Sequence, residues 1–153
     1  MESIPMTPYL ATFTRRWHTH PHLSQTNDPV GYHSGRMAVL ALDFFGADGP
    51  LLAACLVHDL GEHVTGDVPF GSPCKNDYHE EHARLMMGMD YPCDDPRVKF
   101  LDILDSYLWA RHHAPHLMAR DDWQKQCLTI REMADSLGVS DKLREYGLWR
   151  DAQ

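Results

Sequence analysis

The chain contains one almost uninterrupted apolar run, Asp48-Gly49-Pro50-Leu51-Leu52-Ala53-Ala54-Cys55-Leu56-Val57-His58-Asp59-Leu60-Gly61, which lies between two helix-boundary signals. The sequence Asp-Gly-Pro is typical of a helix start, because proline is favoured in the first turn, where its missing N–H has no partner to lose. Glycine is typical of a helix end. Since apolar side chains cover most of the run, we predict a largely buried helix that ends near Gly61.

Apolar residues with helical spacing recur along the rest of the chain, and no strand-like alternation of useful length occurs. One stripe extends from Tyr32 to Phe45 and stops at Gly46, and Asp94-Asp95-Pro96 opens another that continues through Trp109. Further helices are expected around residues 9–17, from 76 or 77 to about 89, over 120–137 and over 142–149. We therefore predict an all-α fold, a compact single-domain bundle of five to six helices that spans residues 1–153.

The composition excludes several classes of partner. The net charge of -8 gives no basic field to attract a nucleic-acid polymer or an anionic membrane. No apolar run approaches the length of a membrane span, and the first residues do not resemble a signal peptide. The four cysteines form no C-x-x-C motif. These features predict a cytoplasmic protein whose partner is a small molecule.

The end of the apolar run carries a concentration of metal-binding side-chain types. His58 and Asp59 are adjacent, Glu62 follows His58 by one helical turn, and Asp67 comes soon after. A borderline metal ion needs imidazole nitrogen and carboxylate oxygen converging on one point. A hydrolytic reaction needs another carboxylate near the metal to handle the proton of water. This segment supplies both types, provided that further ligands come from elsewhere in the chain.

Two other residues are candidates for those further ligands. His33 lies at the start of the preceding predicted helix, and Asp105 lies within an otherwise apolar stretch. A carboxylate on a buried helical face is costly unless it is paired or metal-bound. Asp102 is a competitor, because it lies three residues before Asp105 on the same face and could instead support a ligand from behind.

The order His33, His58-Asp59, Asp105 resembles the H…HD…D signature of the HD-domain metallophosphohydrolases. The longer string H-D-x-x-E-x-x-x-x-D, residues 58–67, continues as Thr-Gly-Asp-Val-Pro and is similar to the subgroup that acts on deoxynucleotides. That subgroup includes bacterial 5'-deoxynucleotidases and small phage dATP triphosphohydrolases. The N-terminal Arg16-Trp17-His18-Thr19 also resembles this subgroup, and the likeness spans roughly residues 15–110.

The resemblance implies a role for each matching residue of the centre. One divalent transition metal, such as zinc, cobalt or manganese, would be bound by His33, His58, Asp59 and Asp105. Glu62 would orient or deprotonate the attacking water. Asp67 would hold the Thr-Gly-Asp loop or contact the sugar or the water.

The resemblance also implies substrate-binding residues outside the metal centre. Arg16 would face phosphate, which suits a guanidinium fork, with Arg15 as the alternative. Trp17 would form a wall against the sugar or base, and the competing interpretation is a buried core aromatic. Lys75, just beyond a glycine-rich loop, is a further phosphate candidate.

The resulting expectation is a metal-dependent phosphohydrolase of deoxynucleotides, favoured as a dATP-like triphosphohydrolase that releases nucleoside and tripolyphosphate. The alternatives are a 5'-deoxynucleotidase that acts on monophosphates, a di-iron oxygenase and a nucleotide-binding module without turnover. The oxygenase would need a second metal held by His79 or His82, which lie three residues apart. The resemblance further implies a homo-oligomer.

Overall fold

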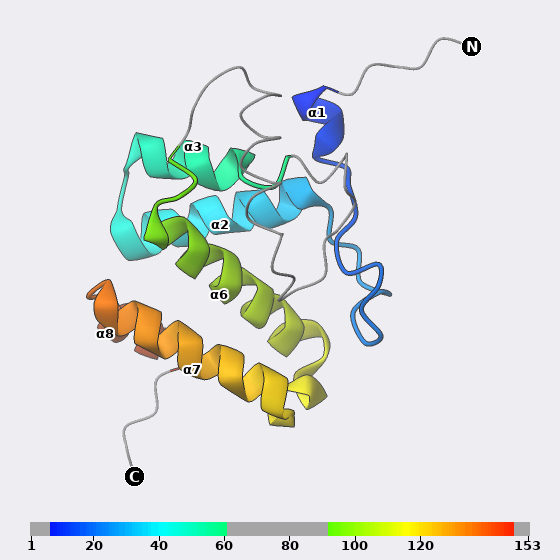
Figure 1. Ribbon diagram of the computed structural model, residues 1–153, viewed down its shortest axis with the longest axis vertical. Coiled ribbons are helices and arrows are strands. Elements are labelled where there is room, and N and C mark those ends of the chain that lie inside the picture. The colour runs from blue at the N-terminus through cyan, green and yellow to red at the C-terminus, as the bar shows by residue number, and fades with distance from the viewer. Residues whose placement is uncertain (1–6, 61–91, 149–153) are drawn as a thin grey trace.

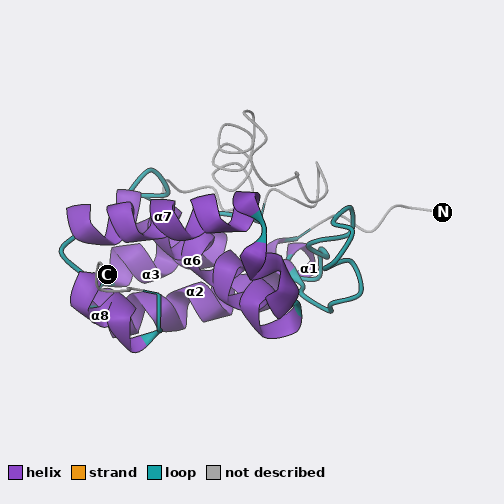
Figure 2. Ribbon diagram, turned by 90° about the horizontal axis from the view of Figure 1, so that it is seen from below, coloured by secondary structure: helices purple, strands orange, loops and turns teal. Residues whose placement is uncertain are grey.

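The computed structural model describes residues 7–60 and 92–148, and these ranges fold into helices joined by turns (Figures 1 and 2). They contain no β-strand, only an isolated bridge between Arg15 and Pro29. The all-α class predicted from the sequence is therefore confirmed. The described elements are α1 (Pro8–Ala11), α2 (Val30–Phe45), α3 (Gly49–Val57), α6 (Pro96–His113), a 3-10 helix (Pro115–Ala119), α7 (Asp121–Ser136) and α8 (Ser140–Glu145).

Helix α6 lies at the centre of this arrangement (Figure 1). It packs against α2 and α3 on one side and against α7 on the other, while α8 packs on α7. Its start is fixed by Asp95, whose side chain accepts a hydrogen bond from the backbone N–H of Arg97 at 2.9 Å. Asp48 caps α3 in the same way through the N–H of Leu51, at 3.0 Å, as the Asp-Gly-Pro sequence predicts.

Two helices are shorter than the sequence predicts. Helix α3 ends at Val57, with His58 as its cap, so the His-Asp pair leaves the helix rather than continuing it. The N-terminal helix stops at Ala11, and Trp17 lies beyond it with φ of 66°, in the left-handed region. The predicted helix over residues 76–89 lies outside the described residues.

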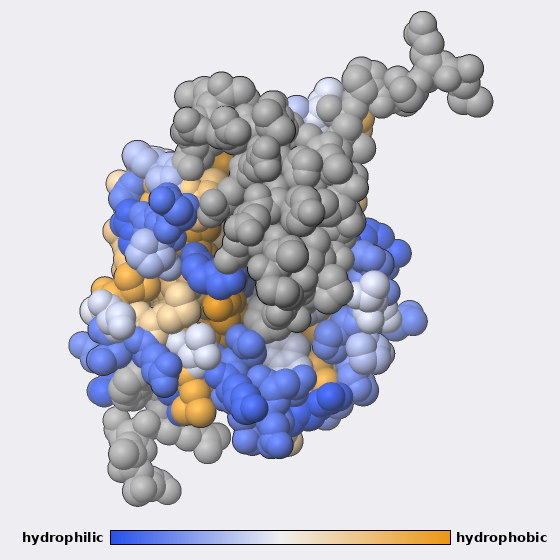
Figure 3. All heavy atoms as spheres, viewed as in Figure 1, coloured by the Kyte–Doolittle hydropathy of each residue, from blue (hydrophilic) through white to orange (hydrophobic). Residues whose placement is uncertain are grey.

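The core is built from α2, α3, α6 and α7, and aromatic rings fill one end of it. Phe44, from α2, meets Phe100 of α6 with ring centroids 5.5 Å apart, and stacks on Tyr146 at 5.4 Å. Phe100 is fully buried. On the face seen in Figure 3, hydrophilic residues alternate with smaller apolar areas over the described surface. Within residues 7–60 and 92–148, no helix combines the length and apolar character needed to cross a bilayer.

Replacing Phe100 by alanine should destabilise the protein by about 3–5 kcal/mol, because it removes a fully buried ring and leaves a cavity between α2 and α6. The same truncation at Phe13, which is 58% exposed, serves as the control and should change the free energy of unfolding little. Urea denaturation followed by circular dichroism measures both. Equal losses for the two variants would contradict this packing.

Candidate metal centre

His33 enters the centre from the first turn of α2, and the N-terminal segment holds that turn in place. The backbone N–H groups of Val30 and Gly31 donate to the carbonyls of Thr14 and Thr12, each at 2.8 Å. A side chain at Gly31 would meet the Cβ of Thr12 at 2.9 Å, so only glycine permits this close approach. The His33 side chain is consequently fully buried and aimed at α3 and α6.

Hydrogen bonds fix both histidine rings in the same tautomer. The Nδ1 of His33 lies 2.6 Å from Oδ2 of Asp105, and the Nδ1 of His58 lies 2.8 Å from the carbonyl oxygen of Cys55. Carboxylate and carbonyl oxygens only accept, so each Nδ1 carries the proton when the ring is neutral. Each Nε2 then presents a lone pair, and both Nε2 atoms are buried without a hydrogen-bond partner. Metal-binding histidines are oriented in the same way.

Two aspartate oxygens approach these lone pairs. Oδ2 of Asp59 lies 3.3 Å from Nε2 of His33 and 3.2 Å from Nε2 of His58. Oδ1 of Asp102 lies 2.9 Å and 3.7 Å from the same two nitrogens. Two ligands bound to one ion at about 2.0–2.2 Å are roughly 2.8–3.6 Å apart at octahedral or tetrahedral angles. One atom from each of these four residues lies within 4.8 Å of the others, so the cluster could hold a metal ion.

The structure brings together three of the four predicted ligands and places Asp102 where Asp105 was expected. The reason is the geometry of α6, on which residues three apart are about one turn distant. Asp102 reaches the Nε2 side of His33, whereas Asp105 reaches its Nδ1 side. Asp105 also accepts hydrogen bonds from Arg36, from Nε at 2.8 Å and from Nη2 at 2.9 Å. Asp105 therefore orients His33, and Asp102 becomes the fourth candidate ligand.

The predicted substrate residues Arg16 and Trp17 both contact Asp28. Arg16 is buried and donates from Nη1 to Asp28 at 2.7 Å and from Nη2 to the hydroxyl of Ser106 at 2.9 Å. Trp17 is 6% exposed, belongs to the core cluster and donates from Nε1 to the same Asp28 oxygen at 3.0 Å. The structure thus places Trp17 in the core, which was the competing interpretation, and its indole anchors the positive-φ turn.

Sequence reasoning missed two members of this network. Asp28 is fully buried and accepts from Arg16, Trp17 and Arg36. Arg36 lies one helical turn after His33, and this spacing is the signal that could have identified it as a partner of the same site. Its guanidinium bridges the two carboxylates of Asp28 and Asp105 and lies 4.3 Å from the ring centroid of Trp109.

The charges around the cluster favour a divalent cation. Among the described residues of this network, four aspartates (Asp28, Asp59, Asp102 and Asp105) face two arginines (Arg16 and Arg36). Neutral histidines leave two negative charges, which is the charge that a divalent ion compensates. The arginines keep their protons. The excess of aspartate charge therefore sets the positive charge that a metal ion or histidine protons must supply.

Without a metal, protons take over part of this role. Burial lowers the pKa of His33, and the charge of Arg16 lowers it further. The carboxylates of Asp102, Asp105 and Asp59 outweigh both effects and raise this pKa to about 9. Burial opposes the charged form of His58 too, and Asp59 and Asp102 raise its pKa well above the ordinary value. Burial raises the pKa of Asp105, but His33 and Arg36 have the larger and opposite effect. The resulting pKa lies below the ordinary value, so this carboxylate stays ionised.

The other predicted site residues fall outside the described residues. These are Glu62, Asp67, Lys75, His79 and His82.

Searches against models of known protein families, against characterised proteins and against solved structures found no match to this chain.

Metal binding should release protons at pH 7.5, because the His33 pKa of about 9 keeps a proton in the metal-free site that a metal must displace. Calorimetric titration with Co²⁺ in two buffers of different ionisation enthalpy measures this release. The apparent enthalpy should differ between the buffers, and the affinity should rise from pH 7 toward pH 9. Identical enthalpies in both buffers would contradict the assignment.

Replacing Asp102 by asparagine should weaken Co²⁺ binding more than the same change at Asp105. Loss of a partner behind a ligand costs on the order of 10–100-fold in metal affinity, and loss of a ligand should cost more. The Co²⁺ absorption spectrum measures both affinities, and circular dichroism verifies that each variant is folded. If the Asp105 variant bound Co²⁺ more weakly than the Asp102 variant, Asp105 would be the metal ligand in place of Asp102.

Proposed function

We propose that the chain is a metal-dependent phosphohydrolase that acts on deoxynucleotides. The observation that carries the proposal is the convergence of two histidine Nε2 atoms and two aspartate oxygens in one cluster, in which three of the four residues are buried. A divalent ion held there would supply a Lewis acid for a phosphoryl oxygen and would make water more acidic. Four protein ligands leave room in an octahedral geometry for two further oxygen atoms.

The buried cation beside the cluster, Arg16, supports an anionic substrate. Arg16 lies close enough to Asp59, Asp102 and Asp105 for their charges to act on it, so its own charge acts on anything that the cluster binds. Its Nη groups are held by Asp28 and Ser106, and its buried Nε has no hydrogen-bond partner among the described residues. The guanidinium is thus fixed beside the cluster, which favours the electrostatic stabilisation of phosphate oxygens.

Glu62 is the residue that we assign to the water. It follows His58 by four residues, in the spacing that the HD-domain resemblance gives to a general base. A carboxylate in this role accepts the proton of the attacking water. Asp67 we assign to the Thr-Gly-Asp loop on the substrate side.

The substrate that we favour is a deoxynucleoside triphosphate such as dATP, on the resemblance of Arg16-Trp17-His18-Thr19 to the phage triphosphohydrolases. Incubation of the Co²⁺- or Mn²⁺-loaded protein with a nucleotide panel should yield nucleoside and tripolyphosphate. Orthophosphate from deoxynucleoside monophosphates would instead assign the nucleotidase reaction. No release of either product from any nucleotide would refute the hydrolase, and two irons per chain would favour the oxygenase.

Replacing Glu62 by glutamine should lower kcat by about 10²–10⁴-fold while Co²⁺ binding is kept, because the change removes the proton acceptor and no proposed ligand. Glu132→Gln is the matched control, since Glu132 is an exposed residue of α7. Its kcat should equal that of the unaltered protein. Unchanged turnover in the Glu62 variant would remove Glu62 from the proposed chemistry.

A further inference from the structure

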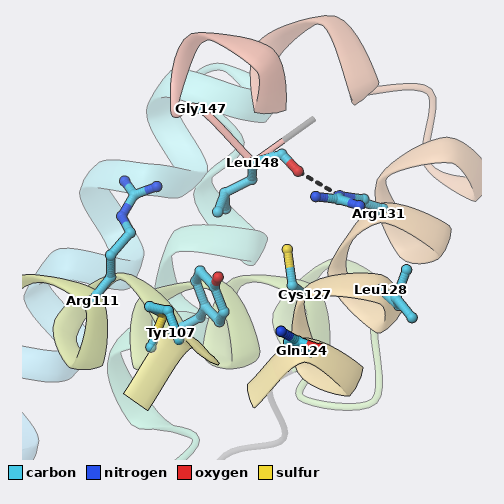
Figure 4. A pocket seen from close by; sticks show the side chains of 9 residues that line it. Tyr107, Arg111, Gln124, Cys127, Leu128, Arg131, Gly147 and Leu148 are labelled. Carbon is cyan, nitrogen blue, oxygen red and sulfur yellow. Dashed lines mark hydrogen bonds between the residues drawn. The ribbon is translucent and has the colours of Figure 1, made fainter. Parts of the chain in front are cut away.

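A polar cavity lies on the side of α6 that faces α7, away from the metal cluster (Figure 4). Its volume is about 500 Å³, which is within the range of small-molecule sites. None of its lining residues belongs to the metal cluster or to the network behind it. They are Tyr107, Arg111, Met118, Gln124, Cys127, Leu128, Arg131, Gly147 and Leu148.

Two arginines reach this cavity from different helices, and the turn after α8 positions both. Arg111 donates from Nη1 to the carbonyl of Tyr146 at 2.9 Å, and Arg131 donates from Nε to the carbonyl of Leu148 at 2.5 Å. Figure 4 shows the two side chains on either side of Leu148. A backbone carbonyl carries no net charge, so these hydrogen bonds orient each guanidinium without neutralising it.

The lack of acidic partners distinguishes these arginines from most others in the chain. Within residues 7–60 and 92–148, neither Arg111 nor Arg131 has a carboxylate at salt-bridge distance. The arginines at 16, 36, 97, 120 and 144 each have one there. The chain has a net charge of -8, so acidic groups are in excess. The two arginines thus share one cavity in which no described carboxylate pairs with them. This arrangement favours binding of an anion from solution.

The rest of the lining suits an organic molecule rather than a bare ion. Met118, Leu128 and Leu148 give apolar walls, and the Gln124 amide and Tyr107 hydroxyl give neutral polar groups. Burial, together with the hydrogen bond to Cys127, raises the pKa of Tyr107 to about 12, so its hydroxyl stays neutral and does not repel an anion. Apolar walls with a few fixed polar groups are typical of ligand sites.

We propose that this cavity binds a small organic anion, with its carboxylate or phosphate group held by Arg111 and Arg131 and its apolar body against Met118, Leu128 and Leu148. Guanidinium groups bind both kinds of oxyanion through paired N–H donors. This site is separate from the proposed hydrolase centre and does not depend on its activity.

The test is an NMR titration of the zinc-loaded protein, whose metal is diamagnetic, with phenyl phosphate, with benzoate and with neutral phenol. Either anion should produce saturable shifts in the backbone amides of Arg111, Cys127, Arg131 and Gly147, and phenol should not. The probe that saturates at the lower concentration identifies the oxyanion class. Because the signals are residue-specific, phosphate binding at the metal centre is observed separately, at His33 and His58.

Gln124→Glu should weaken anion binding at least about 10-fold, because it places a negative charge in the lining and leaves both arginines intact. Gln126→Glu is the matched control, since it makes the same charge change on the same helix outside the lining, and it should bind as the unaltered protein does. The proposal is overturned if neither anion gives saturable shifts at these amides, or if both variants lose binding equally.

Discussion

Four aspartate carboxylates lie close together beside α2, α3 and α6, three of them buried and the fourth, Asp102, partly buried, and the folded state must compensate their charges. An uncompensated buried carboxylate costs several kcal/mol, so cations have to come into the same space. Arg16 and Arg36 provide part of the compensation, and both are tied to Asp28. The remainder falls to the two histidines as protons or to a divalent ion. The N-terminal segment, the start of α2 and the position of α6 are all arranged around this charge balance.

Much of the fold was readable from local patterns in the sequence. The Asp-Gly-Pro and Asp-Asp-Pro starts of α3 and α6 both appear where they were predicted, because capping depends on side chains a few residues away. The N-terminal helix was overestimated, since Tyr9, Phe13 and Trp17 have helical spacing although only residues 8–11 are helical. Tertiary hydrogen bonds explain this difference: the indole of Trp17 is held by Asp28, and residues 12 and 14 pair with the start of α2.

The centre was partly predictable for a related reason. The adjacent His58-Asp59 pair and the early position of His33 in α2 are local features, and the structure brings these three residues together. The choice between Asp102 and Asp105 depends on how far α6 is rotated and shifted against α2, which spacing alone does not determine. Their three-residue separation lets both touch one imidazole, from its two nitrogens. The polar residues behind the cluster, Asp28 and Arg36, likewise became visible only through tertiary contacts.

Helix α6 lies between the candidate metal cluster and the cavity proposed to bind an anion. The side that faces α2 and α3 carries Asp102 and Asp105, while Tyr107 and Arg111 line the cavity toward α7. The most direct measurement of the candidate metal centre is an anomalous diffraction map of crystals loaded with Mn²⁺ or Co²⁺. One peak is expected at about 2.0–2.3 Å from Nε2 of His33, Nε2 of His58, an Asp59 oxygen and an Asp102 oxygen. No peak there, or a peak bound by Asp105 in place of Asp102, would contradict this assignment of ligands.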